Sequence, residues 1–211
     1  MMVRDARQLK DVLTQQVMST SGLEQRRDYL GMSQIGRCPR ELYRLMLEGK
    51  GTGTEERDHW FCWLGYLYES AIVELLGGEP MWQGIEVVAE FDERFRGHVD
   101  YQLDRGGVLW DLVEIKSTSY ARLQSIIRAQ SPVPFHVAQV QAYMRHGYWE
   151  RAFIVYVARD VPGRDWRGMP IWVFELGIDP RIGAALDRKA REVLRAVDEG
   201  VAPECTCGRC G

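Results

Sequence analysis

The sequence predicts an α/β fold in which helices flank one mixed central sheet. Two observations carry this prediction. Helical periodicity in the first part of the chain gives way to consecutive short runs of β-branched and aromatic residues. Helical patterns then return, followed by two more strand patterns and a closing helix. That order of elements is typical of an α/β core with a mixed sheet.

Each element is bounded by residues that start or stop regular structure. Gly77 and Gly78 end the strong helix after Gly51, and Pro180 and Gly200 bracket the last helix. The expected helices cover residues 4–28, 51–78, 119–129, 135–147 and 180–200, and a turn within 32–50 leads into a short helix that ends near Gly49. The helix in 51–78 is expected to be capped by Thr54 and to carry an apolar stripe from Phe61 to Leu75. The expected strands cover 82–91, 95–103, 108–118, 151–159 and 170–178.

Composition limits the possible functions. The net charge of −3 gives no overall basic surface for nucleic acid, so any phosphate-binding surface must be local or use a bound cation. No apolar run approaches the roughly 20 residues of a membrane span, and the charged N-terminal segment does not read as a signal peptide. We therefore expect a cytoplasmic protein, where five cysteines favour metal ligation, catalysis or packing over disulfides.

The chemistry of the chain is concentrated in "GHVD" and "VEIKS". Side chains two residues apart share a face of a strand, so Glu114 and Lys116 point the same way, and a hairpin would bring Asp100 close to them. Two neighbouring carboxylates are costly to bury unless a hard cation such as Mg²⁺ or Mn²⁺ joins them. Lys116 could then orient a water or offset phosphoryl charge. The alternative is a simple Glu114–Lys116 ion pair on a solvated strand.

Six segments in order resemble the PD-(D/E)xK nuclease superfamily, in particular its RecB-like iron–sulfur branch, which includes CRISPR-adaptation nucleases and phage exonucleases. They are "SQIGRCPRELYR", "LGYLYESAIVELL", "GHVD", "EIK", "QVQAY" and the terminal "CTCGRC". The second segment carries Glu69 where RecB-like members usually carry His. The terminal cysteines are closer together than is usual in the family.

The resemblance implies a restriction-endonuclease-like core and a metal-dependent nuclease. It assigns the cation to Glu69, Asp100, Glu114 and the carbonyl of Ile115, and the attacking water to Lys116. Two further residues, Gln139 and Tyr143, would line the same cleft and contact DNA or the groups that hold the metal. Without the resemblance, a solvated helix face for Glu69 and a core position for Tyr143 are the ordinary interpretations.

The cysteines suggest a second metal centre. Pro39 is typical of a first helical position, which places Cys38 at the helix N-cap, where a thiolate is favoured. Four thiolates suit Zn²⁺ or a [4Fe–4S] cluster, and the resemblance favours iron–sulfur. The alternatives are structural Zn²⁺ or a metal-free tail. Such a cluster would staple the N-terminal helical segment to the C-terminus through Cys38, Cys205, Cys207 and Cys210.

We expect one nuclease domain over 1–211, made of an N-terminal helical segment (1–53), the nuclease core (54–200) and the cysteine segment (201–211). His98 shares the presumed face of Asp100, and Cys62 is expected to be a buried packing residue. Candidate DNA contacts are Arg37, Arg40, Arg44, Arg122, Arg128, Arg145, Arg151, Trp60, Trp63, Tyr66 and Tyr120.

The function expected from these features is a Mg²⁺- or Mn²⁺-dependent deoxyribonuclease, an exonuclease acting on single-stranded or frayed DNA. The alternatives are a non-catalytic nucleic-acid-binding subunit with a structural metal cluster, or a CRISPR spacer-processing subunit. Protein partners would then belong to recombination, replication or CRISPR adaptation, and a phage-encoded protein would work in the host cytoplasm.

Overall fold

The computed structural model describes Gln15 and residues 28–48, 56–77, 85–104, 110–160 and 170–208. The helix expected over 4–28 lies almost wholly outside these residues. Thr54, the residue expected to cap the following helix, and Cys210 lie outside them as well.

The helices and strands follow the expected order. They are β1 Leu30–Gly31, η1 Met32–Gln34, α2 Pro39–Glu48, α3 Glu56–Leu75, β2 Ile85–Val88, β3 Phe95–Val99, β4 Tyr101–Asp104, β5 Trp110–Thr118, α4 Tyr120–Ala129, α5 Pro134–Gly147, β6 Arg151–Ala158, β7 Ile171–Gly177 and α6 Pro180–Glu199.

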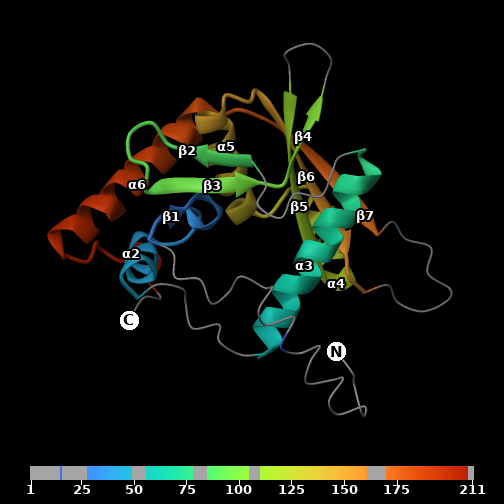
Figure 1. The fold of residues 1–211 in the computed structure, drawn as a ribbon, viewed down its shortest axis with the longest axis horizontal. Helices are drawn as coiled ribbons and strands as arrows, with labels where there is room; N and C mark the ends of the chain where they lie inside the picture. The colour runs from blue at the N-terminus through green and yellow to red at the C-terminus, as the bar shows by residue number, and fades with distance from the viewer. Residues whose placement is uncertain are drawn as a thin grey trace.

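The described strands form two mixed sheets, not the one central sheet we expected. The first has the order β1-β3-β2 and the second β4-β5-β6-β7 (Figure 1). The difference arises at Asp100, which interrupts the strand expected over 95–103, so that β3 belongs to one sheet and β4 to the other. Asp100 therefore lies at the junction of the two sheets.

Strand register then sets the position of the acidic residues. β4 pairs with β5 in antiparallel fashion, with Tyr101 opposite Val113, which confirms the expected hairpin and brings Asp100 beside Glu114. β5 pairs with β6 in parallel fashion, with Lys116 opposite Tyr156.

The second sheet is covered on both faces. Leu112 of β5 joins the larger core, which α4, α5 and α6 share, while Val113 and Ile115 pack with Ile72 and Val73 of α3. This alternation is the two-residue period of a strand with both faces buried. Glu114, between Val113 and Ile115, consequently points to the face that α5 covers.

Helix α3 packs over only part of its length. We expected an apolar stripe from Phe61 to Leu75, but Phe61 is 42% exposed and Leu75 is 79% exposed, whereas Ile72 is buried. Cys62, expected to be buried, is only half-buried. Among the helices that the structure describes, none combines the length and apolar character needed to cross a membrane.

Helices α4 and α6 begin with side-chain caps. Asp179 accepts hydrogen bonds from the N–H groups of Arg181 and Ile182 at the start of α6, and Gly200 ends that helix with φ of 68°. The Ser119 side chain caps α4 in the same way. These caps stabilise the ends of α4 and α6, two of the helices that pack in the larger core.

Candidate active site

Glu114 is the centre of the acidic group. Its side chain is fully buried, and its Oε1 accepts hydrogen bonds from Lys116 Nζ and, at 2.6 Å, from Gln139 Nε2. Its Oε2 is buried and has no hydrogen-bond partner among the described residues. Burial first, and the charge of Asp100 second, raise the pKa of Glu114 to about 8, although Lys116 and Gln139 act in the opposite direction.

Asp100 reaches the same place from the bend between β3 and β4. Its Oδ2 accepts a hydrogen bond of 2.6 Å from the backbone N–H of Ile115. Burial raises the pKa of Asp100, while the charge of Lys116 and the Ile115 N–H lower it. The bend thus fixes one carboxylate directly against the strand that carries the other.

Lys116 supplies the positive charge. Its side chain is 25% exposed and forms an ion pair with Glu114. Burial alone would lower the pKa of Lys116, but the negative charges of Glu114, Asp100 and Glu69 outweigh it and raise the pKa above its ordinary value. The amine is therefore an ammonium ion at neutral pH, able to donate hydrogen bonds but not to ligate a cation.

Glu69 on α3 completes the group. Burial, followed by the charges of Asp100 and Glu114, raises the pKa of Glu69 to about 8, and the charge of Lys116 lowers it. Electrostatic coupling of this kind requires proximity, so Glu69 faces the acidic group and is not on a solvated helix face. The structure thus brings together all four side chains that the sequence singled out.

Gln139 and Tyr143 support this group from inside the core. Gln139 is 4% exposed and Tyr143 is 1% exposed, so the protein interior encloses both. Gln139 Nε2 lies 3.3 Å from Tyr143 OH as well as within hydrogen-bond distance of Glu114. A Cβ at Gly97 would lie 2.8 Å from the Tyr143 ring, so glycine is needed for this packing. The two residues orient Glu114 and do not form an open cleft wall.

The ligand chemistry of the acidic group suits a hard divalent cation. Oxygen ligands suit Mg²⁺ and Mn²⁺, and the partnerless Glu114 Oε2 is a ready ligand atom. The raised pKa values show that the carboxylates are costly to ionise together, a cost that a cation removes. The carboxylate oxygens of this group are not all within 4.8 Å of one another. Among the described residues, the only three ligand atoms that lie so close together are the cysteine sulfurs described below.

Two residues near the site escaped the sequence analysis. Tyr156 OH accepts a 3.0 Å hydrogen bond from the N–H of Val133 and forms a second hydrogen bond, of 2.8 Å, with His136 Nδ1. Burial, with the charges of Lys116 and Arg122, lowers the pKa of His136 to about 4, so its imidazole is neutral. Only the parallel register of β5 and β6 places Tyr156 next to Lys116.

His98, by contrast, was expected near Asp100, but its Nε2 lies 3.9 Å from the carboxylate of Glu86 in the first sheet. The bend at Asp100 explains this difference, because it interrupts the two-residue alternation that would have put both side chains on one face.

The cysteines gather as expected, as far as the structure describes them. The sulfurs of Cys38, Cys205 and Cys207 all lie within 4.8 Å of one another, although the residues are far apart in sequence. Helix α2 begins at Pro39, and the Leu42 N–H donates to the Cys38 carbonyl at 3.0 Å, which confirms Cys38 as the cap residue. This group of three could ligate a metal.

Some expected DNA contacts have other partners. Arg145 pairs with Asp187 and Arg151 with the buried Asp111, each at 2.5 Å, so both arginines hold the fold together. Arg37 pairs with Glu41 within α2. Arg122 is exposed, and its charge acts on His136, so it remains a candidate beside the acidic group.

Trp60, the most exposed of the expected stacking residues on α3, is 36% exposed and meets Trp63 edge to face at 5.3 Å. Trp60 is therefore a candidate for stacking with a nucleobase.

Comparison with known proteins finds similarity in structure only. No family model matches the chain, and no curated protein matches it. The crystal structure of SSO0001 aligns over 89% of this chain and 86% of its own, with 16% identity and a TM-score of 0.60. The alkaline exonuclease LHK-Exo from Laribacter hongkongensis aligns over 88% of this chain and 93% of its own, with 13% identity and a TM-score of 0.60.

The complex of LHK-Exo with dAMP gives similar values, covering 87% of this chain and 92% of the exonuclease, with 14% identity and a TM-score of 0.61. The chain therefore shares its fold with an alkaline exonuclease over most of both lengths.

Proposed function

We propose that this protein is a Mg²⁺- or Mn²⁺-dependent deoxyribonuclease of the PD-(D/E)xK type. The observation that carries the proposal is the buried Glu114, whose Oε2 lacks a partner beside a second carboxylate and a charged lysine. An acid–acid–lysine group of this kind is what metal-assisted phosphodiester hydrolysis requires. The fold shared with an alkaline exonuclease supports the same activity.

Each residue has a distinct role in this proposal. Glu69, Asp100, Glu114 and the Ile115 carbonyl hold the cation. A bound divalent cation supplies positive charge to the phosphodiester and lowers the pKa of a bound water. The Lys116 ammonium donates hydrogen bonds that orient the attacking water or the phosphoryl oxygens. Gln139 keeps the Glu114 carboxylate in place through its 2.6 Å hydrogen bond.

The substrate we propose is single-stranded or frayed DNA, digested from an end. The exonuclease fold supports the mode of cutting. The exposed Arg122 and the exposed Trp60, which lies on the same helix as Glu69, support a strand-binding path. Arg122 and Trp60 are the described residues best placed for such contacts. The RecB-like branch remains our assignment within the superfamily.

The proposal predicts that purified protein degrades labelled DNA in Mn²⁺ or Mg²⁺ and not in EDTA. Asp100→Asn, which keeps the side-chain volume and removes the charge, should lower the rate by about 10²-fold or more, because a metal ligand and its electrostatic contribution are lost. Glu74→Gln is the matched control, since Glu74 is exposed on α3, away from the group. Product release is measured on a 5′-labelled single strand.

Two results would contradict the assignment. If Asp100→Asn cuts DNA as fast as Glu74→Gln, with both variants folded, the acidic group is not the catalytic site. DNA that is bound but never cut by the wild-type protein in Mn²⁺ would instead support the non-catalytic binding subunit.

We also propose that Cys38, Cys205 and Cys207, together with Cys210, hold a structural [4Fe–4S] cluster. Three sulfurs already gathered by distant segments support metal ligation, and four thiolates suit such a cluster or Zn²⁺. Nothing in the proposed hydrolysis needs an electron, so the cluster would join α2 to the segment after α6.

This assignment predicts a brown protein after anaerobic purification, with a broad visible absorption band. Cys205→Ser should remove the band and lower the melting temperature, because metal binding contributes folding free energy. Cys62→Ser, outside the group of three, should keep both. A colourless protein with one bound zinc per chain would mean that the site holds Zn²⁺ and not iron–sulfur. A metal-free wild-type protein whose melting temperature Cys205→Ser leaves unchanged would exclude the cluster.

A further inference from the structure

A pocket of about 590 Å³ lies outside the acidic group, between α6 and the turn that joins β2 to β3. No residue that lines it belongs to the proposed active site. Its walls carry four arginines, three acidic residues and two apolar residues. They are Arg94, Arg188, Arg191, Arg195, Asp92, Glu192, Asp198, Phe91 and Leu194.

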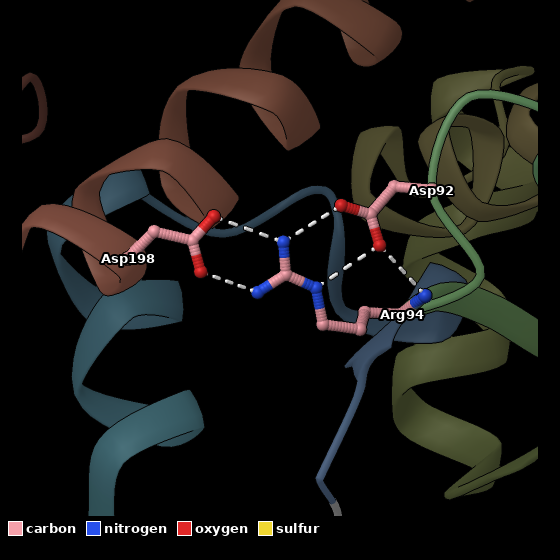
Figure 2. Close-up of polar contacts among 3 residues, drawn as sticks. All are labelled: Asp92, Arg94 and Asp198. Carbon is pink, nitrogen blue, oxygen red and sulfur yellow. Dashed lines mark hydrogen bonds and ion pairs between the residues drawn. The ribbon is translucent and has the colours of Figure 1, made fainter.

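Arg94 forms the rigid wall of this pocket. Figure 2 shows its guanidinium held between Asp92 and Asp198, with contacts of 2.7 Å and 3.0 Å to Asp92 and of 2.6 Å and 3.1 Å to Asp198. Arg94 lowers the pKa of both aspartates, so both stay ionised and bind its guanidinium. We call this group of Asp92, Arg94 and Asp198 the clamp. The clamp fixes the β2–β3 turn to α6 and leaves Glu192 as the acidic residue outside it.

The other three arginines form a row along α6. Arg188, Arg191 and Arg195 are exposed and follow one another at spacings of three and four residues, so they share a helix face over about 10 Å. The Arg191 guanidinium lies 3.9 Å from the centre of the Phe91 ring. Stacking fixes the plane of a guanidinium and leaves its N–H donors in that plane, where they can bind phosphate oxygens.

The row formed by Arg188, Arg191 and Arg195 has positive charge with which it can bind an anionic ligand. Within the parts of the chain that the structure describes, neither Arg188 nor Arg195 forms an ion pair. Arg191 is held by an aromatic ring, and a ring does not neutralise its charge. The three positive charges of the row are opposed by Glu192 and by the one negative charge that remains when Arg94 pairs with two aspartates. The four arginines and three acidic residues therefore leave the pocket with a net charge of +1.

We propose that this pocket binds the phosphodiester backbone of nucleic acid as a second contact outside the active site. Cations spread along two helical turns suit successive phosphates of a strand, whereas a single phosphate needs one or two arginines at one point. The identity of the strand as substrate DNA rests on the proposed function. The contact itself does not, because backbone binding needs no cleavage.

The test measures binding in EDTA, where the proposed nuclease is inactive. A fluorescent single-stranded oligonucleotide is titrated with wild type, with the double variant Arg188→Gln/Arg195→Gln and with Arg181→Gln, at several salt concentrations. Each lost single-strand phosphate contact reduces the slope of log K against log salt by about 0.7, so the double variant should lose about 1.4. Arg181→Gln removes an exposed charge of the same helix outside the pocket and should leave the slope unchanged.

Controls separate this inference from its alternatives. Substitution of exposed arginines should change stability by less than about 0.5 kcal/mol, so thermal unfolding verifies that the variants are folded. Equal slopes in wild type and the double variant overturn the inference. Equal displacement of the oligonucleotide by a free mononucleotide at the same phosphate concentration also overturns it, because the pocket would then bind single phosphates.

Failure of the proposed function looks different. If the wild-type protein never cuts DNA in Mn²⁺ but the double variant still shows the reduced salt slope, the proposed nuclease activity is wrong and the proposed phosphate-binding pocket stands. If the wild-type protein cuts DNA but the salt slope of the double variant is unchanged, the proposed phosphate-binding pocket is wrong and the proposed nuclease activity stands.

Discussion

Lys116→Met should lower the rate of DNA cleavage by about 10³-fold while Mn²⁺ binds at least as tightly as in the wild type. Methionine keeps the length and apolar part of the side chain and removes the ammonium. The ammonium lies against Glu114, the central carboxylate of the acidic group, and its charge opposes that of an incoming cation. Removal of the ammonium therefore favours binding of the cation and slows cleavage of the phosphodiester.

The two effects are measured separately. Cleavage is followed at saturating Mn²⁺, and metal binding by the rise in melting temperature as Mn²⁺ is added to protein stripped with EDTA. Arg181→Met, which removes an exposed charge outside the acidic group, serves as the control for loss of a cation. A Lys116→Met protein that cuts normally, or that loses cleavage only because Mn²⁺ no longer binds, would contradict the role given to Lys116.

The fold was predictable where one local pattern decides the structure. Alternation placed Glu114 and Lys116 on one face of a strand, and Pro180 and Gly200 marked α6 within a residue at each end. The break at Asp100 was not predictable, because "VDY" reads as continuous strand. The side chain of Asp100 accepts a hydrogen bond from the N–H of Ile115, fifteen residues later in the sequence, a contact that no local pattern reveals.

The candidate site was predictable as a set of residues but not as an arrangement. The motif order identified Glu69, yet only packing of α3 against β5 brings it close to Asp100 and Glu114. Periodicity could not reveal the His136–Tyr156 pair or the pocket along α6, since each joins segments that meet only through tertiary contacts. Arg145 and Arg151 read as surface cations for a similar reason, because their partners Asp187 and Asp111 are distant in sequence.

Glu114→Gln should make the metal-free protein more stable than the wild type at pH 8 and above, and should remove most of the stabilisation by Mn²⁺. The folded-state pKa of Glu114 is about 8, above its ordinary value of 4.5, so between these values the folded protein holds a proton that the unfolded chain has released. The free energy of unfolding of the wild type in EDTA must therefore fall as pH rises through this window. Glutamine cannot ionise and escapes this penalty.

The size of the effect makes it measurable. Each pKa unit corresponds to about 1.4 kcal/mol, so ionising the buried Glu114 costs a few kcal/mol. For a domain of this size each kcal/mol shifts the melting temperature by about 2–4 °C, which gives a difference on the order of 10 °C at high pH. Melting temperatures are recorded from pH 5 to pH 9 with EDTA or Mn²⁺, with Glu74→Gln as the control that removes an exposed carboxylate. Because Glu114 Oε2 is the partnerless ligand atom, Mn²⁺ should restore the wild type at pH 8 and leave Glu114→Gln almost unchanged; equal gains in both proteins would mean that the cation does not bind there.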